Sequence, residues 1–471
     1  MGRDIKNEVR PIIIEFADQI AGAKIEIAND KPIPFRDDKE SNKVRKAYKV
    51  PIDLLRFRKD NGRIASDVLT WENSKGPLNE TTDFGQALLK RFLEFKDPEP
   101  TTDLTNLIIK DGQDEMAVIT ADGFLINGNR RKMVFDNLQE KFKGNEKYKY
   151  LKVVILPGPK DNEPLPTNIE IERLENRYQL IRTGKAEYYN FDKALSIKRK
   201  IDLGITLEEQ LKDDANFFPL TGNALKRKIQ EFEDEYLKPL ECIDKYLEYL
   251  KRPGHYNTIS EGRGDSEGRW QAFLDYYRIV YKKLNDERQR IKLNIQEDEI
   301  GKIENVAFKI IRKRELSGLD KKAHQIMRDL PKLLGNAQAK KELFTLVKID
   351  FDLPKEEATD EEGKPVDEKT KDIIWGNKYA KEVIWHVKKA YDFFDQKKDQ
   401  DTPIELLNAA LDKLNHGNMD VKAVELGRID EAMKLTRDIQ VKANEIEHAF
   451  YELKKNKGKL NNKFKNKKTR K

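Results

Sequence analysis

The sequence predicts an α+β domain at the N-terminal side, followed by a predominantly α-helical remainder. Two observations lead to this fold class. From Val50 to Leu156, short apolar runs alternate with turn signals, whereas after Asn168 the apolar residues recur at helical spacing almost to the end of the chain. In addition, 37% of the 471 residues are charged, compared with roughly 25% in an average globular protein. We therefore expect small hydrophobic cores joined by long, solvated helices.

The composition excludes several classes of protein. Cys242 is the only cysteine, so the chain cannot form an internal disulfide, and its five histidines lack the spacing of zinc ligands. No run of the sequence approaches the roughly 18 apolar residues of a membrane-spanning helix. We therefore expect a cytoplasmic, nucleoid-associated protein with no membrane partner.

The net charge of +7 is unevenly distributed along the chain. Residues 454–471 contain ten lysines and arginines but no acidic residue. Such a segment cannot bury a core, so we expect a disordered basic tail that is attracted to polyphosphate. Its candidate DNA-binding residues are Lys465, Lys467, Lys468 and Arg470.

The N-terminal part contains an arm and a domain. Residues 1–47 hold one apolar stretch and then a charged run, and we interpret them as a lead-in arm. The α+β domain is predicted over residues 48–160, and its C-terminal end lies in the proline-rich loop Pro157–Pro164. Its expected elements are strands near Val50–Leu55, Met116–Ile119, Phe124–Ile126 and Val153–Leu156, and a helix over Phe84–Phe95.

The helical remainder divides at turn and linker signals. We expect a helix-turn-helix-like domain at 161–250, a helical domain at 251–349, an acidic linker at 350–371 and a C-terminal helical domain at 372–453. The last of these contains predicted helices over Asp372–Phe394, Pro403–Leu414 and Val421 to about Lys454. The apolar side of the longest helix predicts a partner, either another helix of this chain or a second subunit.

A phosphate-binding segment is predicted where a short strand gives way to a helix. Asp122-Gly123 predicts a hairpin turn and Phe124–Ile126 a buried strand, after which Gly128 would let the backbone approach a ligand closely. Unpaired N–H groups at the start of the next helix, with the guanidinium groups of Gly128-Asn129-Arg130-Arg131, suit a di- or triphosphate. The alternative is a hairpin followed by a surface helix with two solvated arginines.

A second segment, Glu175-Asn176, lies on a predicted helix downstream. Together with Gly128-Asn129-Arg130-Arg131 it resembles the ParB family of chromosome-partitioning proteins and their relatives with the ParB/sulfiredoxin fold. The resemblance implies that the first motif grips the phosphates of a nucleoside triphosphate, with CTP favoured over ATP. It further implies that Glu175 and Asn176 hold the Mg²⁺ that bridges these phosphates, a role that suits one carboxylate and one amide oxygen.

The resemblance extends over residues 48–235. Upstream, Asn61-Gly62-Arg63 is similar to the Pro-Arg turn of the family, which adds Arg63 to the nucleotide-binding residues. Downstream, Gly204–Leu211 resembles the first helix of the family's helix-turn-helix, and Thr221 would cap a recognition helix over Gly222–Phe232. The DNA-binding residues that the resemblance implies on this helix are Lys226, Arg227 and Lys228.

Two departures leave the nucleotide base open. Asn129 stands where the family usually has an acidic residue, and Arg177-Tyr178-Gln179 does not reproduce the Gln-Arg that normally follows the Glu-Asn motif. The contacts that would select one base over another cannot be assigned here.

Three functional hypotheses follow. The first is a nucleotide- and Mg²⁺-dependent DNA-binding switch that hydrolyses its nucleotide slowly. The second is a nuclease or ATPase of a plasmid or phage-defence system, with Asp122, Arg130 and Glu175 as catalytic residues. The absence of histidine from residues 1–254 argues against this second hypothesis, because related enzymes usually carry one near this motif. The third is a non-catalytic adaptor or assembly protein. Under each hypothesis we expect a homodimer or a protein partner through the C-terminal helices.

Overall fold

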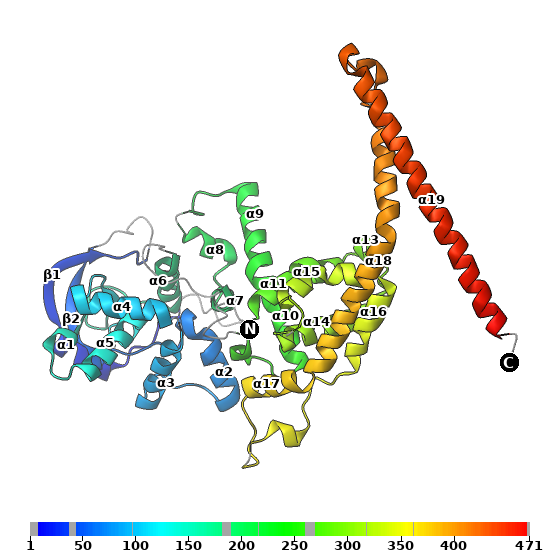
Figure 1. Cartoon of the computed structure of the whole chain (residues 1–471). Helices are drawn as coiled ribbons and strands as arrows, with labels where there is room; N and C mark the ends of the chain where they lie inside the picture. The colour runs from blue at the N-terminus through cyan, green and yellow to red at the C-terminus, as the bar shows by residue number, and fades with distance from the viewer. Residues whose placement is uncertain are drawn as a thin grey trace. The chain divides into compact units, whose positions relative to one another are not determined.

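The computed structural model describes residues 8–36, 44–96, 98–180, 190–214, 216–259, 269–316, 318–360 and 362–468, with the side chains of residues 457–468 left out. The chain divides into two compact units, Met1–Phe394 and Asp395–Lys471 (Figure 1). Among the described helices, none is both long enough and apolar enough to cross a membrane.

The sheet of unit 1 contains five strands among the described residues, in the spatial order β1-β2-β5-β3-β4. The strands are β1 (Ile25–Pro32), β2 (Val44–Pro51), β3 (Ala117–Ile119), β4 (Leu125–Asn127) and β5 (Tyr150–Ile155). β3 and β5 are parallel, with Val118 aligned to Val154, and the other neighbouring pairs are antiparallel. The strands predicted after residue 100 are therefore confirmed within a few residues of their expected ends.

Both faces of the sheet are covered, because its central strands are apolar on both sides. On one face, Ile119 and Val153 pack against α2 (Ala65–Lys75), α3 (Asp83–Glu94), α4 (Pro98–Asp111) and α5 (Asn129–Lys141). On the other face, Val118 and Val154 pack against α6 (Asn168–Leu180) through Ile171. The side chains alternate between the two cores, as the two-residue period of a strand requires.

Residues 1–47 are more than the lead-in arm that the sequence analysis predicted. They contain α1 (Ile14–Ala23) and the edge strand β1, whose Ile25 pairs with Lys49 of β2. The polar residues of β1 hid it from a search for apolar alternation, because an edge strand needs only one paired side and Ile25 is itself exposed.

The helical part of unit 1 shares one hydrophobic core, which extends from Phe191 to Ala390. The predicted boundaries at residue 250 and at the linker 350–371 do not separate this stretch, because buried residues from all of these segments belong to the same core. The α-helices are α7 (Asn190–Asp202), α8 (Leu207–Lys212), α9 (Gly222–Phe232), α10 (Lys238–Tyr249), α11 (Trp270–Asp275), α12 (Lys282–Leu284), α13 (Glu287–Lys292), α14 (Ile300–Lys313), α15 (Ala323–Leu334), α16 (Ala337–Leu343), α17 (Glu368–Lys378) and α18 (Ala380–Leu414).

Short helical turns and two π-helical segments connect these elements. The π-helical segments, η6 (Glu233–Leu237) and η8 (Tyr276–Tyr281), continue α9 and α11. The 3-10 turns are η3 (Ile52–Leu54), η4 (Gly62–Ile64), η5 (Glu146–Tyr148), η7 (Tyr256–Thr258), η9 (Glu297–Glu299), η10 (Phe344–Lys348), η11 (Lys355–Ala358), η12 (Val421–Ala423) and η13 (Leu426–Arg428).

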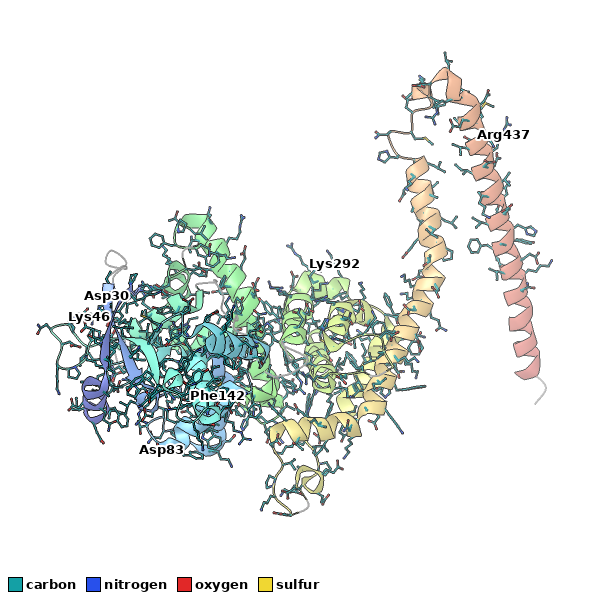
Figure 2. The ribbon with its side chains drawn as sticks, turned by 60° about the vertical axis from the view of Figure 1, so that its left-hand side comes forward. Asp30, Lys46, Asp83, Phe142, Lys292 and Arg437 are labelled. Carbon is teal, nitrogen blue, oxygen red and sulfur yellow. The ribbon has the colours of Figure 1, made fainter. Side chains whose placement is uncertain are left out.

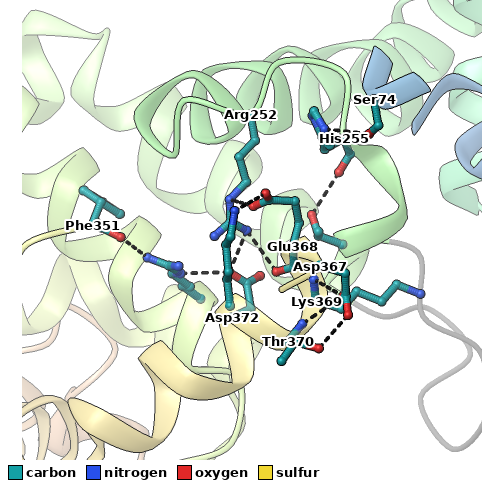
Figure 3. Close-up of polar contacts among 12 residues, drawn as sticks. Ser74, Arg252, His255, Phe351, Asp367, Glu368, Lys369, Thr370 and Asp372 are labelled. Carbon is teal, nitrogen blue, oxygen red and sulfur yellow. Dashed lines mark hydrogen bonds and ion pairs between the residues drawn. The ribbon is translucent and has the colours of Figure 1, made fainter. Parts of the chain in front are cut away.

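A buried carboxylate holds α17 in the helical core. Asp372 accepts hydrogen bonds from Arg252 (2.9 Å), Arg269 (2.8 Å) and Arg312 (3.0 Å), as Figure 3 shows around Arg252 and Asp372. Burial alone would raise the pKa of Asp372, but the three guanidinium charges outweigh it and hold the pKa below its ordinary value. Glu368, at the start of α17, adds a second ion pair to Arg252. The predicted acidic linker therefore ends in a buried, ion-paired helix.

Unit 2 contains the end of α18 and the long helix α19 (Ile429–Lys468). Two predictions fail here. Pro403 lies inside α18 and does not begin a separate helix, and the predicted disordered tail is helical as far as Lys468. Its residue Arg470 lies outside the described residues. Side chains such as Arg437 project from α19 in Figure 2, and no described residue from 395 to 456 is buried.

Replacing Asp372 by asparagine tests how much this ionic cluster contributes to the stability of unit 1. Removing this charge leaves Arg269 and Arg312 buried without their carboxylate and Arg252 with Glu368 alone, so we expect Asp372→Asn to lower the free energy of unfolding of unit 1 by about 3–5 kcal/mol. The four tryptophans lie in unit 1, so their fluorescence during urea unfolding measures this quantity.

The matched control is Asp352→Asn, because Asp352 pairs with Lys251 at 2.6 Å but is 48% exposed. The control should change stability by no more than about 1 kcal/mol.

The same carboxylate predicts a dependence of stability on pH. Because the folded pKa of Asp372 is lowered, its contribution to the free energy of unfolding is complete above the ordinary pKa of aspartate and disappears as the pH falls through the folded pKa. Equal losses in the two variants would contradict the role given to Asp372.

Candidate functional site

A cavity of about 1120 Å³ lies between the α+β part and the helices α7 to α9 of unit 1. Its walls come from η4, from α4, from the turn between β4 and α5, and from α6 to α9. The cavity brings together all seven residues predicted to bind nucleotide, which are Arg63, Gly128, Asn129, Arg130, Arg131, Glu175 and Asn176.

Gly128 begins α5 with a left-handed backbone (φ 98°). A Cβ atom at this position would lie 2.6 Å from the Cβ of Ala117, which is closer than two carbon atoms can approach. Its contact with β3 therefore requires a glycine here, whereas the sequence predicted that the approach of a ligand requires it. The first turn of α5 nevertheless lines the cavity with its residues Asn129 and Arg130.

Two polar atoms on this wall lack a hydrogen-bond partner within the part of the chain that the structure describes. They are Oδ1 of Asn129 and Nη1 of Arg131. The other terminal nitrogen of Arg131 pairs with Glu115 at 2.9 Å, and burial lowers the pKa of the arginine. A buried guanidinium with unused hydrogen-bonding capacity is suited to an anion.

Glu175 and Asn176, the predicted metal ligands, are occupied by protein groups. The carboxylate of Glu175 is paired with the buried Arg58 and accepts a hydrogen bond from the Gly62 backbone N–H at 3.1 Å. The Asn176 carbonyl oxygen accepts a hydrogen bond from Lys200 at 3.1 Å. A cation could use these two oxygens only if Arg58 and Lys200 gave way.

Arg58 and Lys200 are the site residues that sequence reasoning missed. Burial would lower the pKa of Arg58, but the charges of Glu175, Glu172 and Asp60 raise it, so the arginine stays charged. Burial lowers the pKa of Lys200. Arg58 lies three residues before the Asn61-Gly62-Arg63 turn, and this position is the signal that could have found it. Lys200 lies on α7, where the sequence carries no such signal.

The described residues contain no group of three or more histidine, cysteine, aspartate or glutamate side chains that could hold a metal ion. Carboxylates do lie along one wall of the cavity, on and after α4, and include Asp103, Asp111 and Asp114. These three side chains are exposed, so they contribute negative charge at the solvent side of the cavity.

Asp122 does not line the cavity with Arg130 and Glu175, contrary to the arrangement that the nuclease hypothesis requires. Its buried carboxylate accepts hydrogen bonds from Arg10 (2.9 Å), Thr120 (2.6 Å) and the Ile13 backbone N–H (3.1 Å). These contacts attach the N-terminal segment to the hairpin before β4.

The predicted recognition helix has the expected bounds, because α9 spans Gly222–Phe232. Thr221 precedes it but makes no capping hydrogen bond with its side chain, so the predicted cap is wrong. Lys226 and Arg227 are exposed, whereas Lys228 is half-buried, lines the cavity and pairs with Glu231 at 2.9 Å.

The other predicted DNA-binding residues lie at the C-terminal end. The backbone of Lys465, Lys467 and Lys468 belongs to α19, but their side chains are outside the described part of the chain, as is all of Arg470.

Comparisons with known proteins do not extend this description, since no family model, no curated protein and no solved structure matches the chain.

The pairing of Glu175 with Arg58 predicts a large effect on stability. Glu175→Ala would leave the guanidinium of Arg58 buried with less compensation, so we expect a loss of about 3–5 kcal/mol in the free energy of unfolding, measured by urea unfolding without nucleotide. Asp103→Ala removes another carboxylate from the wall of the same cavity, but Asp103 is exposed, and its loss should change stability by no more than about 1 kcal/mol. A Glu175 variant as stable as the Asp103 variant would show that the buried pair contributes little.

Proposed function

We propose that the cavity binds a nucleoside triphosphate complexed with Mg²⁺, and that this binding switches the DNA contacts of α9. The observation that carries the proposal is the convergence of three sequence-distant segments, around Arg63, Arg130 and Glu175, on one cavity. Its volume of about 1120 Å³ is slightly above the range of a few hundred to about 1000 Å³ that small-molecule sites usually occupy.

The charges of the cavity favour a metal-complexed nucleotide over a bare phosphate. Six cationic side chains line it, namely Arg63, Arg130, Arg131, Lys193, Lys200 and Lys228. Seven acidic side chains line it as well, namely Asp103, Asp111, Asp114, Glu115, Glu175, Asp214 and Glu235. A bare triphosphate would be attracted by the first set and repelled by the second, whereas a bound Mg²⁺ neutralises part of its charge and can itself use carboxylate oxygens.

The start of α5 is the proposed phosphate site. α5 is 13 residues long, and its first N–H groups have no partner within the helix, which leaves a partial positive charge beside Arg130 and Arg131. The unused Nη1 of Arg131 offers a directed hydrogen bond to a phosphate oxygen. In this proposal Arg130 and Arg131 hold the phosphates, and Lys200, which also lines the cavity, adds positive charge.

α9 connects the cavity to the proposed DNA surface. Lys228 lines the cavity, while Lys226 and Arg227 on the same helix are exposed to solvent. A ligand that attracts Lys228 would bias the position of this helix, and therefore the position of the two exposed cations. Nucleotide affinity and DNA affinity would then be coupled in both directions.

Arg130→Ala tests nucleotide binding. The side chain is half-buried at the cavity, so we expect its truncation to weaken binding of the Mg²⁺–nucleotide complex at least about tenfold, as for the loss of a charge-assisted hydrogen bond. Isothermal titration with CTP, ATP and GTP in Mg²⁺ measures the effect and identifies the base.

The control is Lys141→Ala, which removes one positive charge from the exposed end of the same helix. It should bind nucleotide as the unchanged protein does. Absence of binding by the unchanged protein to all three nucleotides would reject the proposal.

If Lys226 and Arg227 each neutralise a DNA phosphate, their removal should make DNA binding less dependent on salt. Each neutralised phosphate contributes about −0.9 to the slope of log affinity against log salt, so Lys226→Ala with Arg227→Ala should reduce the magnitude of the slope by about 1.8. Fluorescence anisotropy with a mixed-sequence duplex measures it. The control pair, Arg288→Ala with Lys292→Ala on exposed positions of α13, should leave the slope unchanged. An unchanged slope in the α9 variant would remove this helix from the DNA-binding surface.

A further inference from the structure

The helix α9, which carries the proposed DNA contacts, is only partly packed against the rest of unit 1. Of its 11 residues, Leu225 alone is buried. The other residues of its inner face, Lys228, Ile229 and Phe232, are half-buried. Two of them, Lys228 and Phe232, line the cavity. A ligand in this part of the cavity would therefore bury more of the inner face of α9.

Three aromatic residues form a cluster in the same part of the cavity wall. They come from the turn before α9, from α9 and from η6, and they are Phe217, Phe232 and Tyr236. The ring centroid of Phe232 lies 5.7 Å from that of Phe217 and 5.4 Å from that of Tyr236. The rings are inclined to one another by 80° and 52°. A planar ligand can therefore stack on one ring and meet the edge of a neighbouring ring.

Two lysines adjoin the aromatic cluster and also line the cavity. The ammonium of Lys228 lies 4.9 Å from the ring centroid of Phe217, and that of Lys193 lies 4.7 Å from the ring centroid of Tyr236. A nucleobase combines a flat π face, which stacks on aromatic rings, with nitrogen and oxygen acceptors in the ring plane, which ammonium groups can reach. An inorganic phosphate would attract the lysines but would make no use of the rings.

The π-helical segment η6 is an independent sign of function at this place. It joins α9 to α10 and brings Tyr236 to the cavity. A π-helical turn is rare and is frequently found at functional sites. Asp234 of η6 does not line the cavity but accepts hydrogen bonds from Tyr277 and Lys282, both at 2.6 Å. The segment is thereby fixed to the helical core, and Tyr236 is held in place before a ligand binds.

We propose that the aromatic cluster binds the base of the nucleoside triphosphate, and that the base is the part of the ligand that acts on α9. This inference rests on the proposed function, in which the phosphates lie at the start of α5. That phosphate site contains no residue of α9, whereas the aromatic cluster includes Phe232 and adjoins Lys228. A stacked base completes the packing of the inner face and so restricts the positions of Lys226 and Arg227 on the outer face. The base therefore couples nucleotide binding to DNA binding.

A ligand without a base separates the two parts of the site. Isothermal titration of the unchanged full chain should show that Mg²⁺–tripolyphosphate binds at least about fivefold more weakly than the tightest of CTP, ATP and GTP in Mg²⁺, because one stacked base is lost. In fluorescence anisotropy with a duplex, saturating nucleotide should change the DNA affinity, and saturating tripolyphosphate should leave it unchanged. Tripolyphosphate that binds as tightly as the nucleotide, or that changes the DNA affinity equally, would overturn this inference and leave the proposed function standing.

Phe232→Leu tests the aromatic cluster from the side of the protein. Leucine keeps an apolar contact with Phe217 but offers no ring, so the variant should bind the nucleotide at least about fivefold more weakly and tripolyphosphate as the unchanged chain does. The nucleotide should also lose its effect on DNA binding. Unchanged nucleotide affinity in this variant would contradict the assignment of the base to the aromatic cluster.

The matched control is Phe393→Leu. Phe393 is also a half-buried ring with a lysine nearby, since the ammonium of Lys389 lies 5.7 Å from its centroid, but it belongs to the helical core and does not line the cavity. This variant should bind both ligands as the unchanged chain does. If neither the three nucleotides nor tripolyphosphate binds the unchanged chain, the proposed function fails and this inference fails with it.

Discussion

The buried guanidinium of Arg58 determines how the α+β part of unit 1 fits the helices that follow it. Arg58 pairs with Glu172 and Glu175 of α6, and Glu172 also pairs with Arg199 of α7 at 2.5 Å. Since a charge of this kind is costly to bury without partners, the turn after β2, α6 and α7 must keep their positions together. The wall of the cavity is therefore set by charge neutralisation as much as by apolar packing.

This arrangement gives the proposed ligand a physical means of acting on the protein. A metal-complexed nucleotide would compete with Arg58 for Glu175 and with Lys200 for Asn176, because those oxygens are already hydrogen-bonded. Binding would then change contacts that join η4, α6 and α7, and not only contacts with the ligand. Asp372 in the helical core contrasts with this site, because it is surrounded by three arginines and lies away from the cavity.

Local patterns in the sequence predicted much of the fold. The bounds of α9 agree with the prediction because its start and end depend on nearby residues, and the strands around Val118 and Val154 were visible as apolar runs. β1 was missed because its pairing with β2 is not encoded in its own apolar pattern. The residues around Arg63, Arg130 and Glu175 line one cavity. The pairing of Arg58 with Glu175 joins positions 117 residues apart, and no local pattern reveals such a partner. The binding of a nucleotide, of Mg²⁺ and of DNA is a prediction.

Pro403 has a consequence for how the molecule melts. It lies within α18 but cannot donate a hydrogen bond to the carbonyl of residue 399, and no described side chain between residues 395 and 414 is buried. This stretch depends on its own backbone hydrogen bonds, whereas unit 1 is held by a shared core. Heating should therefore fray the helices after residue 394 gradually. Unit 1 should then lose its structure in a separate, sharper transition.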